Sequence, residues 1–347
     1  MADFDTEGTL ADRMRKHASD EQHLYGHLMR AMADDWDARG PVRDICRGWE
    51  NAPQGAVVQL RLLGGLFRLV LTDRAPDLVP FYPSLGGNEP PAKAWPHVRR
   101  VLGEHVQELR RTLDVAPQTN ETGRSTALLV GLFDVVRRSG LSKVRLLEPG
   151  ASAGLNLLVD QFRFESPTWA YGPGDSALRL VDAVIGPVTA TPFEIVERRG
   201  CDLAPVDATT PEGQLTLRSF VWPFHVERHE RLTQALDIAR RHPVTVDRAG
   251  AGEWLEERLS APAADDVVTV VWQSITQQYW PLDETARVDA VVARAARSQR
   301  VARVAMEFHE RATAELTVDL AAADGSGLDG PIRLGDVGDH GTPVTLS

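Results

Sequence analysis

The spacing of apolar residues predicts a helical N-terminal third. Between residues 6 and 33 apolar side chains recur every three or four positions among charges, with Asp20 as a candidate cap between two helices. A denser apolar pattern covers residues 57–71, and similar spacing covers 95–113. Such spacing places apolar groups on one helix face, which can then be buried. The Pro/Gly-rich residues 76–96 predict a long structured loop.

The rest of the chain alternates between strand-like and helix-like patterns. Thr119 and Asn120 precede an apolar helix pattern through residue 136 and are candidate N-caps. Strand-like runs follow at 144–148, 193–202, 244–250, 267–280, 302–308, 316–321, 332–334 and 344–346, with helical patterns at 155–162, 225–239 and 288–295. This alternation predicts an α/β protein. We divide the chain into a helical region, 1–116, and a sheet domain, 117–347, with an insertion at about 162–192.

Composition narrows the possible partners. A formal net charge of -11 and a pI near 5.4 disfavour nucleic acid, since that affinity comes mainly from Lys and Arg meeting phosphates. The acidic N-terminus lacks the basic and apolar regions of a signal peptide, and no apolar run suggests a membrane span. We therefore expect a cytoplasmic protein with a small-molecule substrate. Only two cysteines are present, too few for a disulfide framework. The pair His23 and His27 has no third ligand nearby, and the pair His225 and His229 lacks the His-Glu-x-x-His order of zinc proteases, so we expect no metal site.

The stretch at residues 144–154 contains the main candidate residues for ligand binding. A strand-like run ends at Glu148, and residues 150–154 read Gly-Ala-Ser-Ala-Gly before an apolar pattern resumes. Small residues in such a turn let backbone N–H groups approach a ligand closely. A carboxylate at the carboxyl end of a strand repels phosphate but accepts hydrogen bonds from hydroxyl or amine groups. In open α/β sheets this edge is where ligands bind.

Several segments resemble a known bacterial family. Residues 148–158, together with 118–124, 82–87 and 221–223, are similar to domain of unknown function 2332, and the similarity covers nearly the whole chain. The turn itself resembles the first motif of class I S-adenosylmethionine-dependent methyltransferases, an acidic residue followed by G-x-x-x-G. That resemblance implies a Rossmann-like sheet, mostly parallel with antiparallel closing strands, and S-adenosylmethionine as cofactor. The methyl acceptor remains unknown.

The methyltransferase resemblance assigns roles to individual residues. The implied cofactor-binding residues are Glu148, Gly150, Ala151, Ser152, Gly154, Asp202, Asp247 and Ser274, with Asp207 as an alternative to Asp202. Candidate substrate-binding residues are Tyr82, Gln118, Asn120, Arg124 and Gln278. Candidate general bases are Tyr279, Glu121 and His309. The Asp/Asn-Pro-Pro-Tyr/Phe motif of nucleic-acid amino methyltransferases is absent, which again favours a small acceptor.

Two other functions are compatible with the same turn. Residues 150–154 also satisfy G-x-S-x-G, in which Ser152 would be the nucleophile of a serine hydrolase. The charge and the proline at Glu148-Pro149 are unusual ahead of such a nucleophile, and the mostly helical chain before them lacks the expected strands. A third reading is a protein that binds S-adenosylmethionine without turnover, because a fold alone does not fix function.

Overall fold

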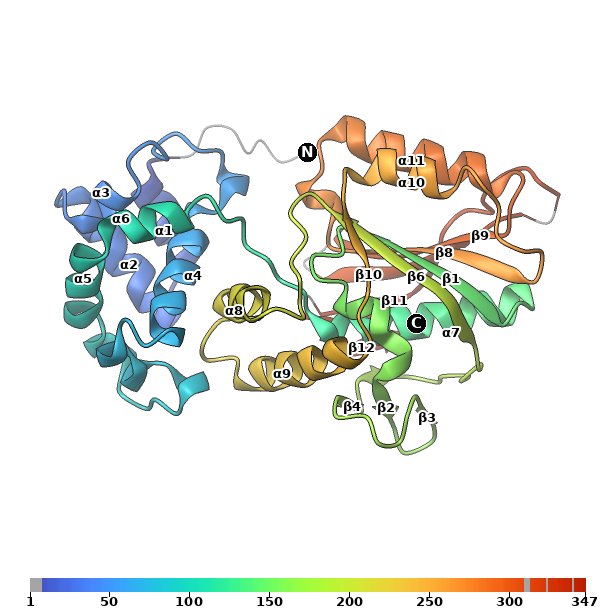
Figure 1. Ribbon diagram of the computed structural model, residues 1–347, viewed down its shortest axis with the longest axis horizontal. Coiled ribbons are helices and arrows are strands. Elements are labelled where there is room, and N and C mark those ends of the chain that lie inside the picture. The colour runs from blue at the N-terminus through green and yellow to red at the C-terminus, as the bar shows by residue number, and fades with distance from the viewer. Residues whose placement is uncertain (1–7, 309–312, 323, 339) are drawn as a thin grey trace. The chain divides into compact units, whose positions relative to one another are not determined.

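The computed structural model describes residues 8–308, 313–322, 324–338 and 340–347 (Figure 1). These residues form two compact units, which we call the helical unit and the sheet unit. The helical unit comprises the chain up to Thr119 together with Pro211–Glu230, and the sheet unit comprises Asn120–Thr210 and Arg231–Ser347. The single boundary predicted near residue 116 lies close to the first of these divisions. That residues 211–230 join the helical unit does not follow from the sequence pattern.

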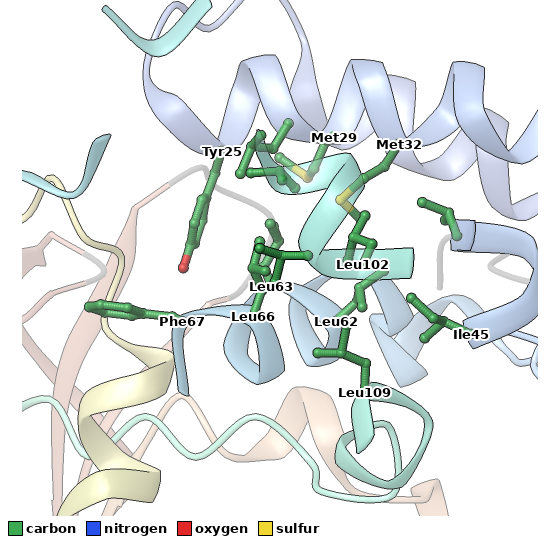
Figure 2. Packing of buried hydrophobic residues seen from close by; sticks show 14 of the residues in the cluster. Tyr25, Met29, Met32, Ile45, Leu62, Leu63, Leu66, Phe67, Leu102 and Leu109 are labelled. Atoms are coloured by element: carbon green, nitrogen blue, oxygen red, sulfur yellow. The ribbon is translucent and has the colours of Figure 1, made fainter. Parts of the chain in front are cut away.

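The helical unit is built from short helices around one apolar core. The helices are α1 (Leu10–Ala18), α2 (Leu24–Asp37), α3 (Pro41–Ile45), α4 (Val58–Leu71), α5 (Trp95–Glu104), α6 (Val106–Thr112), α8 (Pro211–Phe220) and the start of α9 (Val226–Arg241). Short 3-10 turns join them: η1 (Gln54–Ala56), η2 (Pro76–Phe81), η3 (Pro83–Leu85) and η4 (Pro91–Lys93). Figure 2 shows Leu62, Leu63 and Leu66 of α4 among side chains from the surrounding helices, so α4 is the central helix of this core.

The apolar character of α4 reflects this burial. By length and composition alone, Gln54–Leu71 would be long and apolar enough to cross a membrane, and 56% of that window is buried inside the structure. A core helix of a soluble protein meets the same criterion. Close packing also shapes the sequence of α4, because a Cβ atom at Gly64 would lie 2.6 Å from Cε1 of Phe220 in α8.

Two local predictions for the helical unit were wrong. The cap of α2 is His23, whose Nδ1 accepts a hydrogen bond from the Gly26 N–H at 3.0 Å, and not Asp20. The pattern over residues 95–113 forms two helices, which break at His105, instead of one. In both cases the apolar spacing identified the helical residues. It did not indicate which groups form hydrogen bonds with the free backbone N–H and C=O groups at the helix ends.

The sheet unit contains a nine-stranded mixed sheet in the order β5-β12-β11-β10-β9-β8-β1-β6-β7 among its described residues. The strands are β1 (Lys143–Pro149), β5 (Val184–Ile185), β6 (Glu194–Asp202), β7 (Val246–Arg248), β8 (Val267–Ser274), β9 (Val301–Phe308), β10 (Ala314–Leu320), β11 (Ile332–Val337) and β12 (Val344–Leu346). From β7 to β9 neighbouring strands are parallel, and β9 to β12 pair antiparallel. A mostly parallel α/β sheet with antiparallel closing strands is therefore confirmed.

Helices cover both faces of the parallel strands. In Figure 1, α10 (Ala251–Arg258) and α11 (Leu282–Ala296) lie on one side of the sheet and α7 (Ser125–Ser139) lies on the other. Leu147 of β1 and Val271 of β8 belong to the same buried cluster as residues of α10 and α11. Because side chains alternate along a strand, Glu148 points to the face covered by α7. Every residue of β8 is buried, as expected for a strand covered on both faces.

The predicted insertion forms a small separate sheet. β2 (Arg163–Glu165) pairs with β3 (Ala170–Tyr171) and β4 (Arg179–Val181). The chain then returns to the main sheet, where β5 pairs with β12. The stacked rings of Tyr171 and Phe193, with centroids 5.1 Å apart, pack against Phe133 of α7. The insertion is thus fixed to the sheet unit by aromatic contacts.

Candidate functional site

The strand order places a ligand-binding position at the carboxyl end of β1. From β1 the chain continues to β6 and β7 on one side, whereas β8 and β9 lie on the other side. The order therefore reverses between β1 and β8. In open α/β sheets ligands bind in the crevice beyond the strand ends at such a reversal. Glu148, Asp202, Ser274 and Glu307 lie at or next to the carboxyl ends of β1, β6, β8 and β9.

The turn after β1 depends on left-handed backbone conformations. Gly150, Ser152 and Gly154 have φ values of 75°, 54° and 72°. The N–H groups of Gly150 and Ala151 both donate to the carbonyl of Cys201, at 2.8 and 2.9 Å, which ties the turn to the end of β6. A Cβ atom at Gly150 would lie only 2.6 Å from Cγ2 of Thr276, so glycine is needed there for space as well as for conformation.

A short 3-10 helix, η6 (Leu155–Gln161), follows this turn where the sequence predicted an ordinary helix. Its first N–H group, that of Leu155, donates to Oδ1 of Asn120 at 2.8 Å. Asn120 was expected to cap the helix that follows it in the chain. It instead satisfies the start of η6, 35 residues later. The predicted substrate-binding residue Asn120 is thus placed directly beside the turn.

Glu148 is a buried carboxyl group with an unsatisfied oxygen. The residue is 2% exposed, and its Oε2 has no hydrogen-bond partner. Burial raises the pKa of Glu148 to about 8, although Asn156, Arg124 and Trp272 act in the opposite direction. Asn156 is held by Ser125, whose Oγ donates to Oδ1 at 2.7 Å. At neutral pH a carboxyl group with this pKa is mostly protonated and able to donate a hydrogen bond.

A second buried carboxyl group, Glu307, lies at the end of β9. It is 3% exposed, and its Oε1 accepts hydrogen bonds from the N–H and Oγ1 of Thr276 at 3.0 and 3.2 Å. Burial raises its pKa to about 7, against the opposing effect of these hydrogen bonds and of Arg124. Sequence reasoning missed Glu307. The available signal was a lone acidic residue near the carboxyl end of an otherwise apolar strand.

Arg124 is the cation common to both carboxyl groups. Its Nη1 donates to the carbonyl of Ser274 at 2.9 Å, and its charge lowers the pKa of both Glu148 and Glu307. The short helix η5 (Thr122–Arg124) presents it, and Oε1 of Glu121 accepts from the Gly123 N–H at 3.0 Å at the start of that helix. Glu121 also pairs with Arg231 at 3.4 Å. The structure thus brings Glu121 and Arg124 to the predicted edge.

The two predicted aspartates have different surroundings. Asp202 accepts the N–H of Ser152 at Oδ2 and that of Ala204 at Oδ1, both at 2.9 Å, so it closes the turn after β1. Asp247 forms a two-point ion pair with Arg199 at 2.9 and 3.0 Å and accepts the Nε1–H of Trp254 at 2.8 Å. The Arg199 guanidinium lowers the pKa of Asp247. Asp207, the alternative to Asp202, accepts the N–H and Oγ1 of Thr209.

Other predicted residues do not share one location. Tyr279 and Gln278 are exposed on η7 (Gln277–Tyr279), just beyond β8. Tyr82 and Gln118 belong to the helical unit, where Tyr82 is buried with its ring stacked on Phe67. His309 lies outside the described residues. Within the described part of the chain no group of three or more His, Cys, Asp or Glu residues could hold a metal ion.

The chain matches one protein family over nearly its whole length. Residues 8–345 match the family described as uncharacterized protein conserved in bacteria (DUF2332). The chain belongs to this family. No curated protein and no solved structure matches the sequence significantly. Because the DUF2332 match spans both the helical unit and the sheet unit, the two units are parts of one family architecture.

Proposed function

We propose that this DUF2332 protein is an S-adenosylmethionine-dependent methyltransferase that acts on a small molecule. The observation that carries the proposal is the position of Glu148, a buried carboxyl group with an unpartnered oxygen where the strand order reverses. A buried acid without a partner is costly, and a bound donor group would remove that cost. The ammonium or the ribose hydroxyls of S-adenosylmethionine are donors of this kind.

The residues around the turn fit such a cofactor. Glu148 and Asp202 supply acceptors on adjacent strands, and the turn at 150–154 presents backbone close to them without bulky side chains. The fit also accounts for an acidic residue at a position where a phosphate-binding turn would avoid one. When bound, the cofactor would supply a methyl group already activated by its sulfonium.

The protein's own contribution would then be positioning and proton handling. Bringing acceptor and donor together in a site that excludes water accounts for much of the rate in such reactions. Glu307 is held in one orientation by Thr276 and is buried, so it can accept a proton from an acceptor hydroxyl or amine. Tyr279, Glu121 and His309 remain the other candidates for this role.

Calorimetric titration of the full chain with S-adenosylmethionine and with S-adenosylhomocysteine tests the proposal. We expect both to bind, and Glu148→Gln to weaken binding at least tenfold. Glu194→Gln is the matched control, because Glu194 is an exposed acid at the opposite end of the neighbouring strand β6. The proposed site is rejected if neither compound binds. It is also rejected if wild type and Glu148→Gln bind equally well.

Catalysis needs a separate readout, because a protein that only binds the cofactor passes the titration. Incubation with S-adenosylmethionine carrying a labelled methyl group and a bacterial small-molecule extract should transfer label to a new product. Binding without transfer across such extracts supports the binding protein instead. Mass spectrometry of small molecules that co-purify with the chain would identify candidate acceptors directly.

One observation favours the serine hydrolase as a second candidate. Ser152 has a φ of 54°, and a strained turn of this kind exposes the nucleophile in enzymes with G-x-S-x-G. An alkyl fluorophosphonate probe should label wild type but not Ser152→Ala if this candidate is correct. The methyltransferase proposal expects no such labelling and expects cofactor binding to survive in Ser152→Ala.

A further inference from the structure

We propose that Gln273 of β8 anchors a site for a ligand with a neutral amide group, which enters when the segment 275–279 after β8 moves aside. Gln273 is the next-to-last residue of β8, and its exposed fraction is 0%. Neither Nε2 nor Oε1 of its side chain has a hydrogen-bond partner among the described residues. The ligand would be the methyl acceptor, and only this identification rests on the proposed function.

Gln273 lies on the face of the sheet that α10 and α11 cover (Figure 1). Val271, two residues earlier in β8, belongs to the buried cluster of those helices, and side chains two positions apart on a strand share a face. Gln273 pairs with Ala305 of β9, and Glu307 follows two residues later on that strand. Gln273 and Glu307 are therefore neighbours at the carboxyl edge of the sheet, on the opposite face from Glu148.

The amide of Gln273 is unfavourable for the free protein. Its burial removes two polar atoms from water, and no hydrogen bond offsets that loss. An apolar side chain of similar size would avoid the cost, so packing gives no reason for a glutamine at this position. Residues that break a packing rule without a structural gain are expected at functional sites. A ligand that bonds to both amide atoms would remove the cost.

The amide group also defines the chemistry of the ligand. Nε2 donates and Oε1 accepts, at the two ends of one planar group. A carboxamide or a lactam presents the complementary C=O and N–H and can bond to both atoms at once. An ammonium would leave Nε2 without an acceptor, and a carboxylate would leave Oε1 without a donor. Tyr279 and Leu282, which follow in the chain, are 69% and 74% exposed and suit an apolar part attached to the amide.

The segment 275–279 is held by hydrogen bonds and not by its own conformational preference. Ile275 has a φ of 52°, an unfavourable conformation for a β-branched residue. The next residue, Thr276, is tied through its N–H and Oγ1 to Oε1 of Glu307, at 3.0 and 3.2 Å. A few bonds thus keep a strained backbone in place directly after Gln273. Their release would relax Ile275 and give a ligand access to the amide.

Benzamide is a suitable probe, because it carries a neutral amide on an apolar ring. In isotope-labelled protein the side-chain NH₂ signals of Gln273 are identified by their absence from Gln273→Leu. We expect benzamide to shift these signals together with the backbone amide signal of Thr276. N,N-dimethylbenzamide, which has no N–H donor, and benzoate, which is charged, should bind wild type at least tenfold more weakly. Equal binding of the three compounds, or signals that benzamide leaves unmoved, overturns the inference.

Stability provides a second readout, which a merely structural role of the amide would not produce. Gln273→Leu should lose benzamide binding and yet unfold at a higher urea concentration than wild type, because it removes unpartnered polar atoms from the core. Gln107→Leu is the matched control, because Gln107 is exposed on α6, and it should leave benzamide binding unchanged. A lower urea midpoint for Gln273→Leu, or benzamide binding equal to that of wild type, overturns the inference.

The titrations with benzamide contain no cofactor, so their outcome is separate from that of the proposed function. Binding of benzamide without binding of S-adenosylmethionine supports the amide site and rejects its identification as the acceptor site. Binding of S-adenosylmethionine without binding of benzamide overturns the amide site and leaves the proposed methyl transfer standing.

Discussion

Nη1 of Arg124 donates to the carbonyl of Ser274 at 2.9 Å, across 150 positions of the chain. This bond fixes a guanidinium at the end of β8, which lies between β1 and β9. Glu148 and Glu307 are the next-to-last residues of those two strands. Both carboxyl groups are buried, and the same cation lowers the pKa of each. At the carboxyl edge of the sheet, the charge of Arg124 therefore influences the ionisation of both Glu148 and Glu307.

Removing this cation should destabilise the protein. Arg124→Gln deletes the charge that favours ionisation of two buried acids and loses a charged hydrogen bond to a carbonyl. We expect the free energy of unfolding to fall by about 1.5–3 kcal/mol, the usual worth of such a bond. Urea denaturation at pH 7 measures the change. Arg100→Gln, in an exposed ion-pair cluster, should cost less than about 1 kcal/mol, and equal losses in both variants would contradict this account.

Stability should decrease as pH rises, because of Glu148. Its pKa is raised to about 8 in the folded state from 4.5, so between these values the folded state binds more protons than the unfolded state. Unfolding free energy then falls with increasing pH by up to about 1.4 kcal/mol per pH unit for one such group. Glu307, with a pKa raised to about 7, contributes in the same direction.

The variant Glu148→Gln isolates this effect. It keeps the size of the side chain but cannot ionise, so the decline in stability between pH 5 and 8 should become shallower than in wild type. Urea unfolding midpoints at several pH values provide the comparison, with Glu194→Gln as a control that leaves the slope unchanged. A slope that Glu148→Gln does not alter would show that Glu148 is not buried as a neutral acid.

Most strands and several helices could be predicted from the sequence, because buried positions are apolar and recur with the period of a strand or a helix. The pattern 57–71 predicted α4 within one residue. The run 267–280 predicted β8 and its start, but the strand ends at Ser274, six residues earlier than predicted. The site was only partly predictable. Glu148 follows from its motif, whereas Glu307 and the bond between Asn120 and Leu155 depend on strand order and on contacts between distant segments. Apolar periodicity contains neither kind of information.

Gly150 should not tolerate a side chain. Gly150→Ala would force an L-residue into a φ of 75° and place its Cβ 2.6 Å from Cγ2 of Thr276. We expect a loss of about 2–3 kcal/mol, of which roughly 1–2 kcal/mol is conformational strain. Combining it with Thr276→Ser, which removes Cγ2, should recover the steric part only. If the double variant is no more stable than the sum of its single losses predicts, the close contact is not the cause.

Asn120 should act as the cap of η6 and not of the helix that follows it in sequence. Asn120→Ala removes the acceptor of the Leu155 N–H, and loss of a cap costs about 0.5–2 kcal/mol. The neighbouring Thr119→Ala is the control, because Thr119 is exposed and was an equally good cap candidate by sequence alone. Amide hydrogen exchange provides the specific readout. The Leu155 N–H should exchange faster in Asn120→Ala but not in Thr119→Ala, and faster exchange at the start of α7 instead would assign the cap to the local helix. Since η6 directly follows the turn beside Glu148, the same variant should also weaken S-adenosylmethionine binding if that turn holds the cofactor.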